Sequence, residues 1–326
     1  MAVYTRLTEA DLDGLLADFA LGSLTRFAGI DGGIENTNYF VDLQSDAGPR
    51  RLVLTLFEEL GFDDMPFFVE LTGYLAARGV PVPAPFKDQH GIALKSLANR
   101  PTLLLPRFAG QPLETPGAEH CGQIGDALAR FHCAGADFFM TRQAHRGVFW
   151  WRRESGRVAG RLDEADATLL RQEVALFDQL RCRPLDLPAG VIHGDLFVDN
   201  ALFEHDRLSG IIDLYNACTG YFLYDLAIVA NDWCSAADGR FDPTRLDALL
   251  QAYAAVRPFT ADEHRAWPVL LRTAAMRFWL SRLISWHGLD TPGHGGEPVL
   301  KDPEPLRQIL LLRIAEPGQL PAPRAE

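Results

Sequence analysis

The pattern of apolar residues changes once along the chain, and this change constrains the fold more than any other feature. Before about residue 110, short apolar runs are separated by turn residues, as expected for β-strands. After Pro116, apolar residues recur at helical spacing over 117–134, 148–160, 163–181, 243–256, 261–287 and 304–315. The sequence therefore predicts an α+β, bilobal protein with a small antiparallel-sheet lobe at 1–108 and a larger, mostly helical lobe at 109–326.

The first lobe combines strand signals with two helix signals. Thr8 and Asp11 approximate a capping box for a helix over 8–20, and Pro66 begins a second helix that Gly79 ends. Strands are predicted on both sides of a glycine-rich turn within 27–41, and at 51–57, 91–94 and 102–107. The segment 106–110 is predicted to link the lobes.

Charge and composition exclude several classes of partner. The chain has 43 acidic and 31 basic residues, a net charge of −12, and only three of the bases are lysines. Nucleic acids and anionic membranes bind basic surfaces, so we expect neither as a partner. No apolar run reaches the ~18 residues of a membrane span, no secretory signal is evident, and the five cysteines form no C-x-x-C pair. We expect a cytoplasmic protein, and the sequence does not indicate its oligomeric state.

The densest group of polar residues lies in a β-rich stretch of the second lobe. His193, Asp195 and Asn200 fall within 191–203, and Asp213 follows a second apolar run. A hairpin-like unit anchored by its apolar residues would bring these side chains into one cleft. Buried polar groups need partners, which a divalent cation and a phosphate-bearing substrate would supply. Asn200 and Asp213 offer the oxygen ligands that magnesium prefers.

The pattern H-G-D-L-x-x-x-N, followed by I-I-D, resembles the catalytic loop and metal-binding aspartate of aminoglycoside-phosphotransferase-like small-molecule kinases. The resemblance covers nearly the whole chain and implies a protein-kinase-like fold. Within this family the sequence is most similar to homoserine kinases, at 35–41, 52–58, 66–71, 213–218, 224–227 and 231–234. This resemblance implies ATP and Mg²⁺ as cofactors and phosphorylation of the hydroxyl of L-homoserine, which feeds threonine synthesis.

The resemblance also implies roles for individual residues. Asp195 would be the catalytic base, His193 and Asp225 would support the loop, and Asn200 and Asp213 would hold magnesium on the phosphates. Contacts to the nucleotide are expected from a turn and strands of the first lobe, namely Gly32, Gly33, Asn36, Asn38, Val53, Leu105, Arg107 and Phe108. The two glycines would let the backbone of the turn approach the phosphates closely.

One position departs from the usual kinase pattern. Alternation along 51–57 places Thr55 where such kinases carry a phosphate-binding lysine, and Glu70 fits the glutamate that pairs with this lysine. The resemblance to homoserine kinases implies that this threonine belongs to their pattern. Charge neutralisation of ATP would then depend on magnesium, on the backbone of the turn and on an arginine such as Arg51.

The residues that contact the substrate are less well defined by the sequence. Asp199 is a candidate because it adjoins Asn200, and Arg277 and Arg282 are candidates for binding a substrate carboxylate. Kinases of the same fold that act on an aminoglycoside, choline or a methylthio-sugar stay open as alternatives, as does a nucleotide-binding pseudokinase. A metal-dependent phosphohydrolase would need more His or Asp ligands than 193–213 provides.

Overall fold

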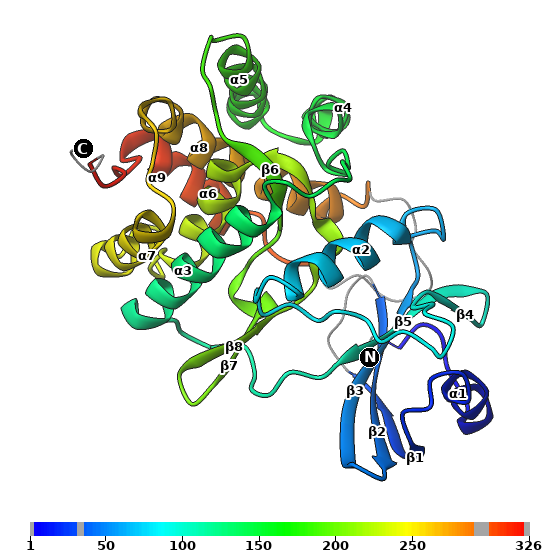
Figure 1. Cartoon of the computed structure of the whole chain (residues 1–326). Coiled ribbons are helices and arrows are strands. Elements are labelled where there is room, and N and C mark those ends of the chain that lie inside the picture. Colours follow the sequence, from blue (N-terminus) through cyan, green and yellow to red (C-terminus); the bar gives the residue numbers. More distant parts are fainter. Residues whose placement is uncertain (1–2, 31–35, 290–299, 323–326) are drawn as a thin grey trace. The chain divides into compact units, whose positions relative to one another are not determined.

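The computed structural model describes residues 3–30, 36–289 and 300–322 (Figure 1). The chain divides into two compact units, with a boundary between Ala109 and Gly110. An antiparallel sheet dominates the first unit, and helices dominate the second. The predicted α+β fold class is therefore confirmed. Among the described residues, no helix combines the length and the apolar character needed to cross a bilayer.

The first unit is built on a five-stranded antiparallel sheet with the strand order β1-β2-β3-β5-β4. Its elements are α1 (Glu9–Leu16), β1 (Ser23–Gly29), β2 (Asn36–Ser45), β3 (Gly48–Phe57), α2 (Met65–Ala76), β4 (Lys95–Leu97) and β5 (Arg100–Pro106). In Figure 1, α1 lies beside the sheet at β1.

Alternation along β3 gives the sheet two different faces. Leu52, Leu54 and Leu56 are buried in one apolar cluster with Leu12 and Leu16 of α1. Since successive side chains of a strand point to opposite faces, the residues between these leucines point away from α1. That second face is the one on which nucleotide contacts are predicted.

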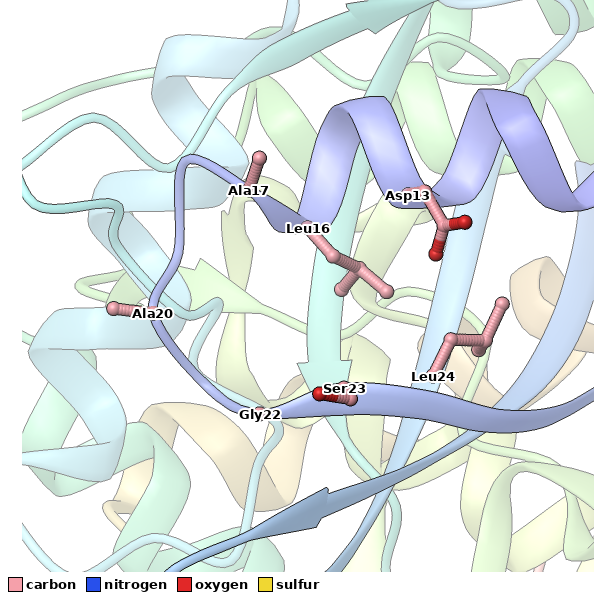
Figure 2. A pocket seen from close by; sticks show the side chains of 7 residues that line it. All are labelled: Asp13, Leu16, Ala17, Ala20, Gly22, Ser23 and Leu24. Atoms are coloured by element: carbon pink, nitrogen blue, oxygen red, sulfur yellow. The ribbon is translucent and has the colours of Figure 1, made fainter.

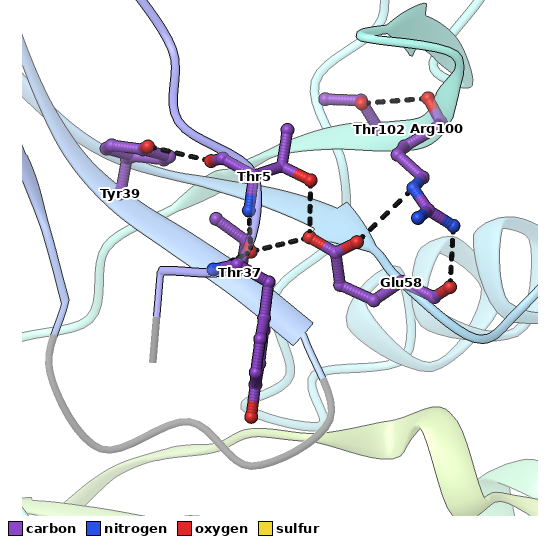
Figure 3. Close-up of polar contacts among 7 residues, drawn as sticks. Thr5, Thr37, Tyr39, Glu58, Arg100 and Thr102 are labelled. Atoms are coloured by element: carbon purple, nitrogen blue, oxygen red, sulfur yellow. Dashed lines mark hydrogen bonds and ion pairs between the residues drawn. The ribbon is translucent and has the colours of Figure 1, made fainter. Parts of the chain in front are cut away.

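A buried carboxylate fastens the end of β3 (Figure 3). Glu58 is 6% exposed, and its Oε1 accepts hydrogen bonds from the hydroxyls of Thr5, at 2.7 Å, and Thr37, at 2.6 Å. Its Oε2 lies 3.2 Å from Nε of Arg100, which also donates from Nη1 to the Glu58 carbonyl at 2.8 Å. These contacts tie the amino-terminal segment, β2 and β5 to the end of β3.

The second unit packs helices around two small sheets. Its helices are α3 (Ala118–Gly135), α4 (Val148–Val158), α5 (Glu164–Arg181), α6 (Phe222–Trp233), α7 (Pro243–Val256), α8 (Ala261–Trp286) and α9 (Glu304–Ala315). One sheet pairs β6 (Ala189–Ile192) with β9 (Cys218–Tyr221), and the other pairs β7 (Ala201–Glu204) with β8 (Arg207–Ile211). Short 3-10 turns at Val198–Asn200 and Leu214–Asn216 lie between these strands.

The predicted strand at 91–94 is wrong, because the short strand β4 begins only at Lys95. A side chain holds the preceding residues in a turn. Oδ1 of Asp88 accepts hydrogen bonds from the backbone N–H groups of His90 and Ile92, both at 2.8 Å. Gly91, with φ of +82°, completes the turn in a conformation that glycine adopts readily.

Helix α6 is not among the helices predicted from the sequence, although it carries Asp225. Ten of its twelve residues are buried, and its polar residues, Tyr224 and Asp225 at one end and Asn231 and Asp232 at the other, lie seven positions apart on one face. Between them runs a short apolar stretch at 226–230, and periodicity does not distinguish such a stretch from a buried strand. Strand β9, which directly precedes α6, is also missing from the prediction.

Candidate active site

The segment between β6 and β7 carries the kinase-like motif, and its conformation requires a glycine. Gly194 has φ of +76°, and a Cβ atom there would lie 2.9 Å from the carbonyl oxygen of Asn216. His193 is fully buried, and its Nε2 donates to the carbonyl oxygen of Ile212 at 3.0 Å. Its Nδ1 accepts from the backbone N–H of Asp195 at 3.3 Å. Burial lowers the pKa of His193, so the neutral ring joins Asp195 to the segment before Asp213.

Hydrogen bonds join the segments of the two predicted metal ligands to the same loop. Nδ2 of Asn200 donates to the carbonyl oxygen of Asp195 at 2.8 Å, and the Asn200 carbonyl accepts from the N–H of Ile212 at 2.9 Å. Because its amide nitrogen is engaged, Asn200 has its Oδ1 to offer to a cation. Asp213 follows Ile212 directly and has φ of +60°, which aspartate tolerates better than most residues. The backbone contacts therefore bring together the segments that carry Asp195, Asn200 and Asp213.

This donor set fits magnesium that is bound together with phosphates. Magnesium in phosphoryl-transfer sites usually takes one or two carboxylates, with water and substrate phosphates completing its shell. One carboxylate, Asp213, and one amide oxygen, Asn200, match that use. In the described part of the chain, no group of three or more His, Cys, Asp or Glu side chains could hold a metal ion. The donors therefore suit a nucleotide-bound cation better than a resident structural metal.

Asp225 of α6 stabilises the loop through buried hydrogen bonds. It is fully buried, its Oδ2 accepts from the N–H of His193 at 2.7 Å, and its Oδ1 accepts from the N–H of Gly194 at 2.8 Å. Nε2 of His132 lies 3.1 Å from Oδ2. Burial alone would raise the pKa of Asp225, but the hydrogen bond from His132, together with the backbone N–H groups, holds the pKa below its ordinary value. The carboxylate is therefore charged at neutral pH and accepts from three donors.

His132 of α3 and Tyr253 of α7 extend this network, although the sequence predicts a role at the site for neither of them. The Tyr253 hydroxyl lies 2.8 Å from Nδ1 of His132. Because ionised Asp225 can only accept, Nε2 of His132 carries the proton and Nδ1 accepts from the tyrosine. Burial lowers the pKa of His132, which keeps the ring neutral. Neither residue belongs to a motif, so only their packing in the fold reveals the connection.

In the first unit, predicted nucleotide contacts share the sheet face that points away from α1. The strand register pairs Asn38 with Thr55, and Val53 with Leu105. Asn36 lies two residues before Asn38 on β2 and therefore shares this face. Gly32 and Gly33 lie outside the described residues.

The predicted contacts beyond the end of β5 differ in exposure. Arg107 is exposed, and its guanidinium carbon lies 3.6 Å from the ring centroid of Phe40. The backbone N–H of Arg107 donates to the carbonyl of Arg51 at 3.2 Å, which continues the pairing with β3. Phe108 is half-buried. An exposed guanidinium thus lies at the edge of the face that carries Val53.

Thr55, at the position where the sequence predicts the kinase lysine to be replaced, forms a neutral pair with Asn38. Thr55 is 3% exposed, and its hydroxyl donates to Oδ1 of Asn38 at 2.7 Å. Glu70 is exposed on α2, and no hydrogen bond or ion pair joins it to another residue in the described part of the chain. The usual lysine–glutamate pair is therefore absent from the described residues, and Thr55 orients an asparagine that is itself a predicted nucleotide contact.

The candidate substrate residues differ in their surroundings. Asp199 is exposed, whereas Arg277 is 4% exposed and its guanidinium carbon lies 3.8 Å from the ring centroid of Phe278. Arg282 is half-buried and donates from Nη1 to the carbonyl of Asp302 at 3.0 Å. Asp232 of α6 is missing from the predicted site, although its Oδ2 accepts from the N–H of Val198 at 2.8 Å. The sequence match at 231–234 could have drawn attention to this residue.

The first unit also contains a pocket between the end of α1 and the start of β1 (Figure 2). Its lining residues are Asp13, Leu16, Ala17, Ala20, Gly22, Ser23 and Leu24. Asp13 is the one ionisable side chain in this lining, and none of the predicted site residues belongs to it. This pocket is therefore separate from the motif-bearing elements.

Comparison with known proteins decides the family. A model of the phosphotransferase enzyme family matches residues 26–259. The chain belongs to this family. Homoserine kinase from Pseudomonas aeruginosa is 45% identical over 285 residues, which cover 87% of this chain and 89% of that protein. Homoserine kinase from Methylobacillus flagellatus is 43% identical over 323 residues, 98% of each chain. The predicted family resemblance is thus confirmed.

Solved structures of other phosphotransferases share the fold. An amicoumacin kinase, solved with AMP-PNP and Ca²⁺, aligns with a TM-score of 0.67 at 14% identity, covering 94% of this chain and 92% of that one. A choline/ethanolamine kinase family protein from Mesorhizobium loti aligns with a TM-score of 0.60 at 18% identity, over 94% and 92%. These matches confirm the predicted protein-kinase-like fold.

Proposed function

We propose that this protein is an ATP-dependent homoserine kinase, which converts L-homoserine to O-phospho-L-homoserine in threonine biosynthesis. The observation that carries the proposal is the buried hydrogen-bonded frame that holds the Asp195 backbone beside the Asn200 and Asp213 segments. Membership of a phosphotransferase family supports the reaction class. The substrate is supported by relatives named homoserine kinase that match the chain over most of its length.

Asp195 is the residue that we assign to the substrate hydroxyl. Its carboxylate accepts the hydroxyl proton while the hydroxyl oxygen bonds to the γ-phosphorus, and the bond from that phosphorus to the ADP oxygen breaks. Phosphoryl transfer passes through a loose transition state, so catalysis depends on positioning and on charge stabilisation. The Asp195 backbone is held at both ends, at N–H by His193 and at the carbonyl by Asn200. A loop fixed in this way supplies the positioning that the reaction needs.

Nucleotide contacts are assigned within each unit taken by itself. In the second unit, Asn200 and Asp213 would hold magnesium, which neutralises phosphate charge when it is bound with ATP. In the first unit, Val53 and Leu105 offer an apolar strand face for the adenine, and Asn38 offers an oriented amide. Thr55 carries no charge, so exposed arginines such as Arg107 and Arg51 are the cations that we assign to this part of the site.

The partners follow from charge and size. We propose a small-molecule substrate, a cytoplasmic location, and neither nucleic acid nor membrane as a partner. A net charge of −12 disfavours binding to polyanionic surfaces.

A coupled assay of ADP release tests the proposed function. We expect ADP formation with L-homoserine, little with choline or kanamycin, complete loss of activity in EDTA, and recovery on addition of Mg²⁺. Turnover of choline or kanamycin without turnover of homoserine would identify a different kinase of the same fold. Binding of ATP without ADP formation from any acceptor would identify a pseudokinase, and activity that persists in EDTA would exclude the metal assignment.

Thr55→Val is expected to raise the KM for ATP several-fold and to lower the stability of the first unit by about 1 kcal/mol. Valine has the shape of threonine but removes the hydroxyl that donates to Asn38 Oδ1. Thr55→Ser keeps this hydroxyl and is the matched control. Steady-state kinetics at saturating homoserine and thermal unfolding provide the measurements. If folded Thr55→Val kept the wild-type KM for ATP, this position would not contribute to nucleotide binding.

A further inference from the structure

Two helices contact the loop that follows Asp195. Asp232, near the end of α6, accepts a hydrogen bond at Oδ2 from the N–H of Val198 at 2.8 Å. Phe278 of α8 packs edge-on against Phe197, with 4.5 Å between ring centroids. Arg282 follows Phe278 by four residues, so both lie on the same face of α8. An acid from α6 and a base from α8 therefore flank the segment 197–198.

Asp232 and Arg282 carry opposite charges, but they do not form a pair. Both are half-buried, and no ion pair joins them within the described chain. Within the described chain, both side chains form hydrogen bonds with backbone groups. Asp232 accepts from the Val198 N–H, and Arg282 donates to the Asp302 carbonyl. In an ordinary surface ion pair, the two side chains would meet directly.

The two charges are nevertheless close enough to influence each other. The pKa of Asp232 is raised to about 6, chiefly by burial and also by the nearby charges of Asp199 and Asp195, while the Val198 N–H and the charge of Arg282 oppose this rise. Burial also lowers the pKa of Arg282, and Asp232 opposes that change. Half-burial makes each charge costly in the absence of a counter-ion. A small molecule that carries both an ammonium and a carboxylate would provide both counter-ions at once.

We propose that Asp232 binds the ammonium group and Arg282 the carboxylate of the amino-acid substrate, so that these two residues select a zwitterion. This proposal rests on the proposed function and identifies the residues that determine specificity at the same site. The arginine–carboxylate and ammonium–carboxylate contacts are both charge-assisted hydrogen bonds. Choline and aminoglycosides carry positive charge without a carboxylate, so they would leave Arg282 without a counter-ion. The proposed pair would thus disfavour choline and aminoglycosides as substrates.

Removing one charge from the protein and one from the ligand tests each contact separately. Asp232→Asn keeps an oxygen for the Val198 N–H but loses the charge, and Arg282→Gln loses the guanidinium. Each variant is expected to lower kcat/KM for L-homoserine by about 30-fold or more, mainly through KM, with the KM for ATP unchanged. The probes are 4-hydroxybutanoate, which lacks the ammonium, and 3-aminobutan-1-ol, which lacks the carboxylate. Both are measured as competitive inhibitors of homoserine phosphorylation.

The inhibition constants should show a crossed pattern. Asp232→Asn should weaken 3-aminobutan-1-ol but not 4-hydroxybutanoate, and Arg282→Gln should do the reverse. Arg265→Gln is the control, because Arg265 is exposed on α8 and pairs with Asp262 on its own helix. Its kinetics should equal those of the wild type.

Several outcomes would overturn the proposal. They are an unchanged kcat/KM for homoserine in either folded variant, or equal weakening of both inhibitors by each variant. Thermal unfolding identifies a variant that does not fold. If one variant fails to fold, the other variant still tests its own contact. A wild-type enzyme without homoserine activity would instead refute the proposed function itself.

Discussion

Asp195→Asn is expected to lower kcat for homoserine phosphorylation by about 10³-fold while changing the KM for ATP by no more than about threefold. Asparagine has the same shape as aspartate, and the backbone contacts of residue 195 with His193 and Asn200 do not involve its side chain. The loop should therefore keep its conformation. The amide cannot accept the proton of the substrate hydroxyl, so the loss should appear in kcat. Steady-state kinetics with both substrates varied provide the measurement.

Asp206→Asn is the matched control for this variant. Asp206 is an exposed aspartate in the turn between β7 and β8, and its carboxylate contacts His120 at 3.3 Å. The same chemical change at this position should leave kcat and both KM values at wild-type levels. If folded Asp195→Asn retained near-normal turnover, its assigned role in orienting the hydroxyl would be wrong.

Asp225→Ala is expected to lower the free energy of unfolding by about 3–5 kcal/mol and to abolish most of the activity. The buried carboxylate accepts hydrogen bonds from the N–H groups of His193 and Gly194 and from Nε2 of His132. Removing it leaves three buried donors without an acceptor, and the loop that carries Asp195 loses its support. Urea unfolding followed by circular dichroism, together with kcat, provides the measurement.

The pH dependence of this effect has a definite sign. The pKa of Asp225 is held below its ordinary value of 3.8 in the folded protein, so its stabilising contribution is present above about pH 4 and is lost as the pH falls through the folded pKa. The difference in stability between wild type and Asp225→Ala should therefore shrink on acidification below pH 4. A constant difference across that range would show that the charge of Asp225 does not account for its effect.

Tyr253→Phe is a milder change in the same hydrogen-bond network and serves as the comparison for Asp225→Ala. It removes the hydroxyl that donates to Nδ1 of His132 but leaves Asp225 and its three donors in place. We expect a loss of about 1 kcal/mol and a small decrease in kcat. Equal losses in the two variants would contradict the central position of Asp225 in the network.

Long helices with recurring apolar residues are predictable from this sequence, whereas a short helix built on one continuous apolar run is not. Helices α7 and α9 have the bounds expected from their amphipathic patterns, at 243–256 and 304–315. Helix α6 escapes prediction because its apolar residues at 226–230 form one short continuous run, which periodicity does not distinguish from a buried strand. The helix that carries both Asp225 and Asp232 is therefore the one that periodicity cannot identify.

The candidate site likewise has residues that the sequence predicts and residues that only the fold brings together. His193, Asp195 and Asn200 are adjacent in sequence, and their spacing alone predicts a shared site. His132 and Tyr253 are 121 residues apart and meet only through the packing of α3 against α7. The departure at Thr55 is visible in the sequence, but only the strand register shows that Asn38 is its hydrogen-bonding partner. Long-range contacts of this kind depend on the fold and leave no local pattern.

Identification of the product tests the central claim most directly. The protein is incubated with ATP, Mg²⁺ and L-homoserine, and the phosphorus species are followed by ³¹P NMR. We predict that a phosphate monoester matching O-phospho-L-homoserine appears in an amount equal to the ADP formed, and that Asp195→Asn forms neither at a comparable rate. Absence of this ester, or ADP accompanied only by inorganic phosphate, would contradict the assignment of the chain as a homoserine kinase.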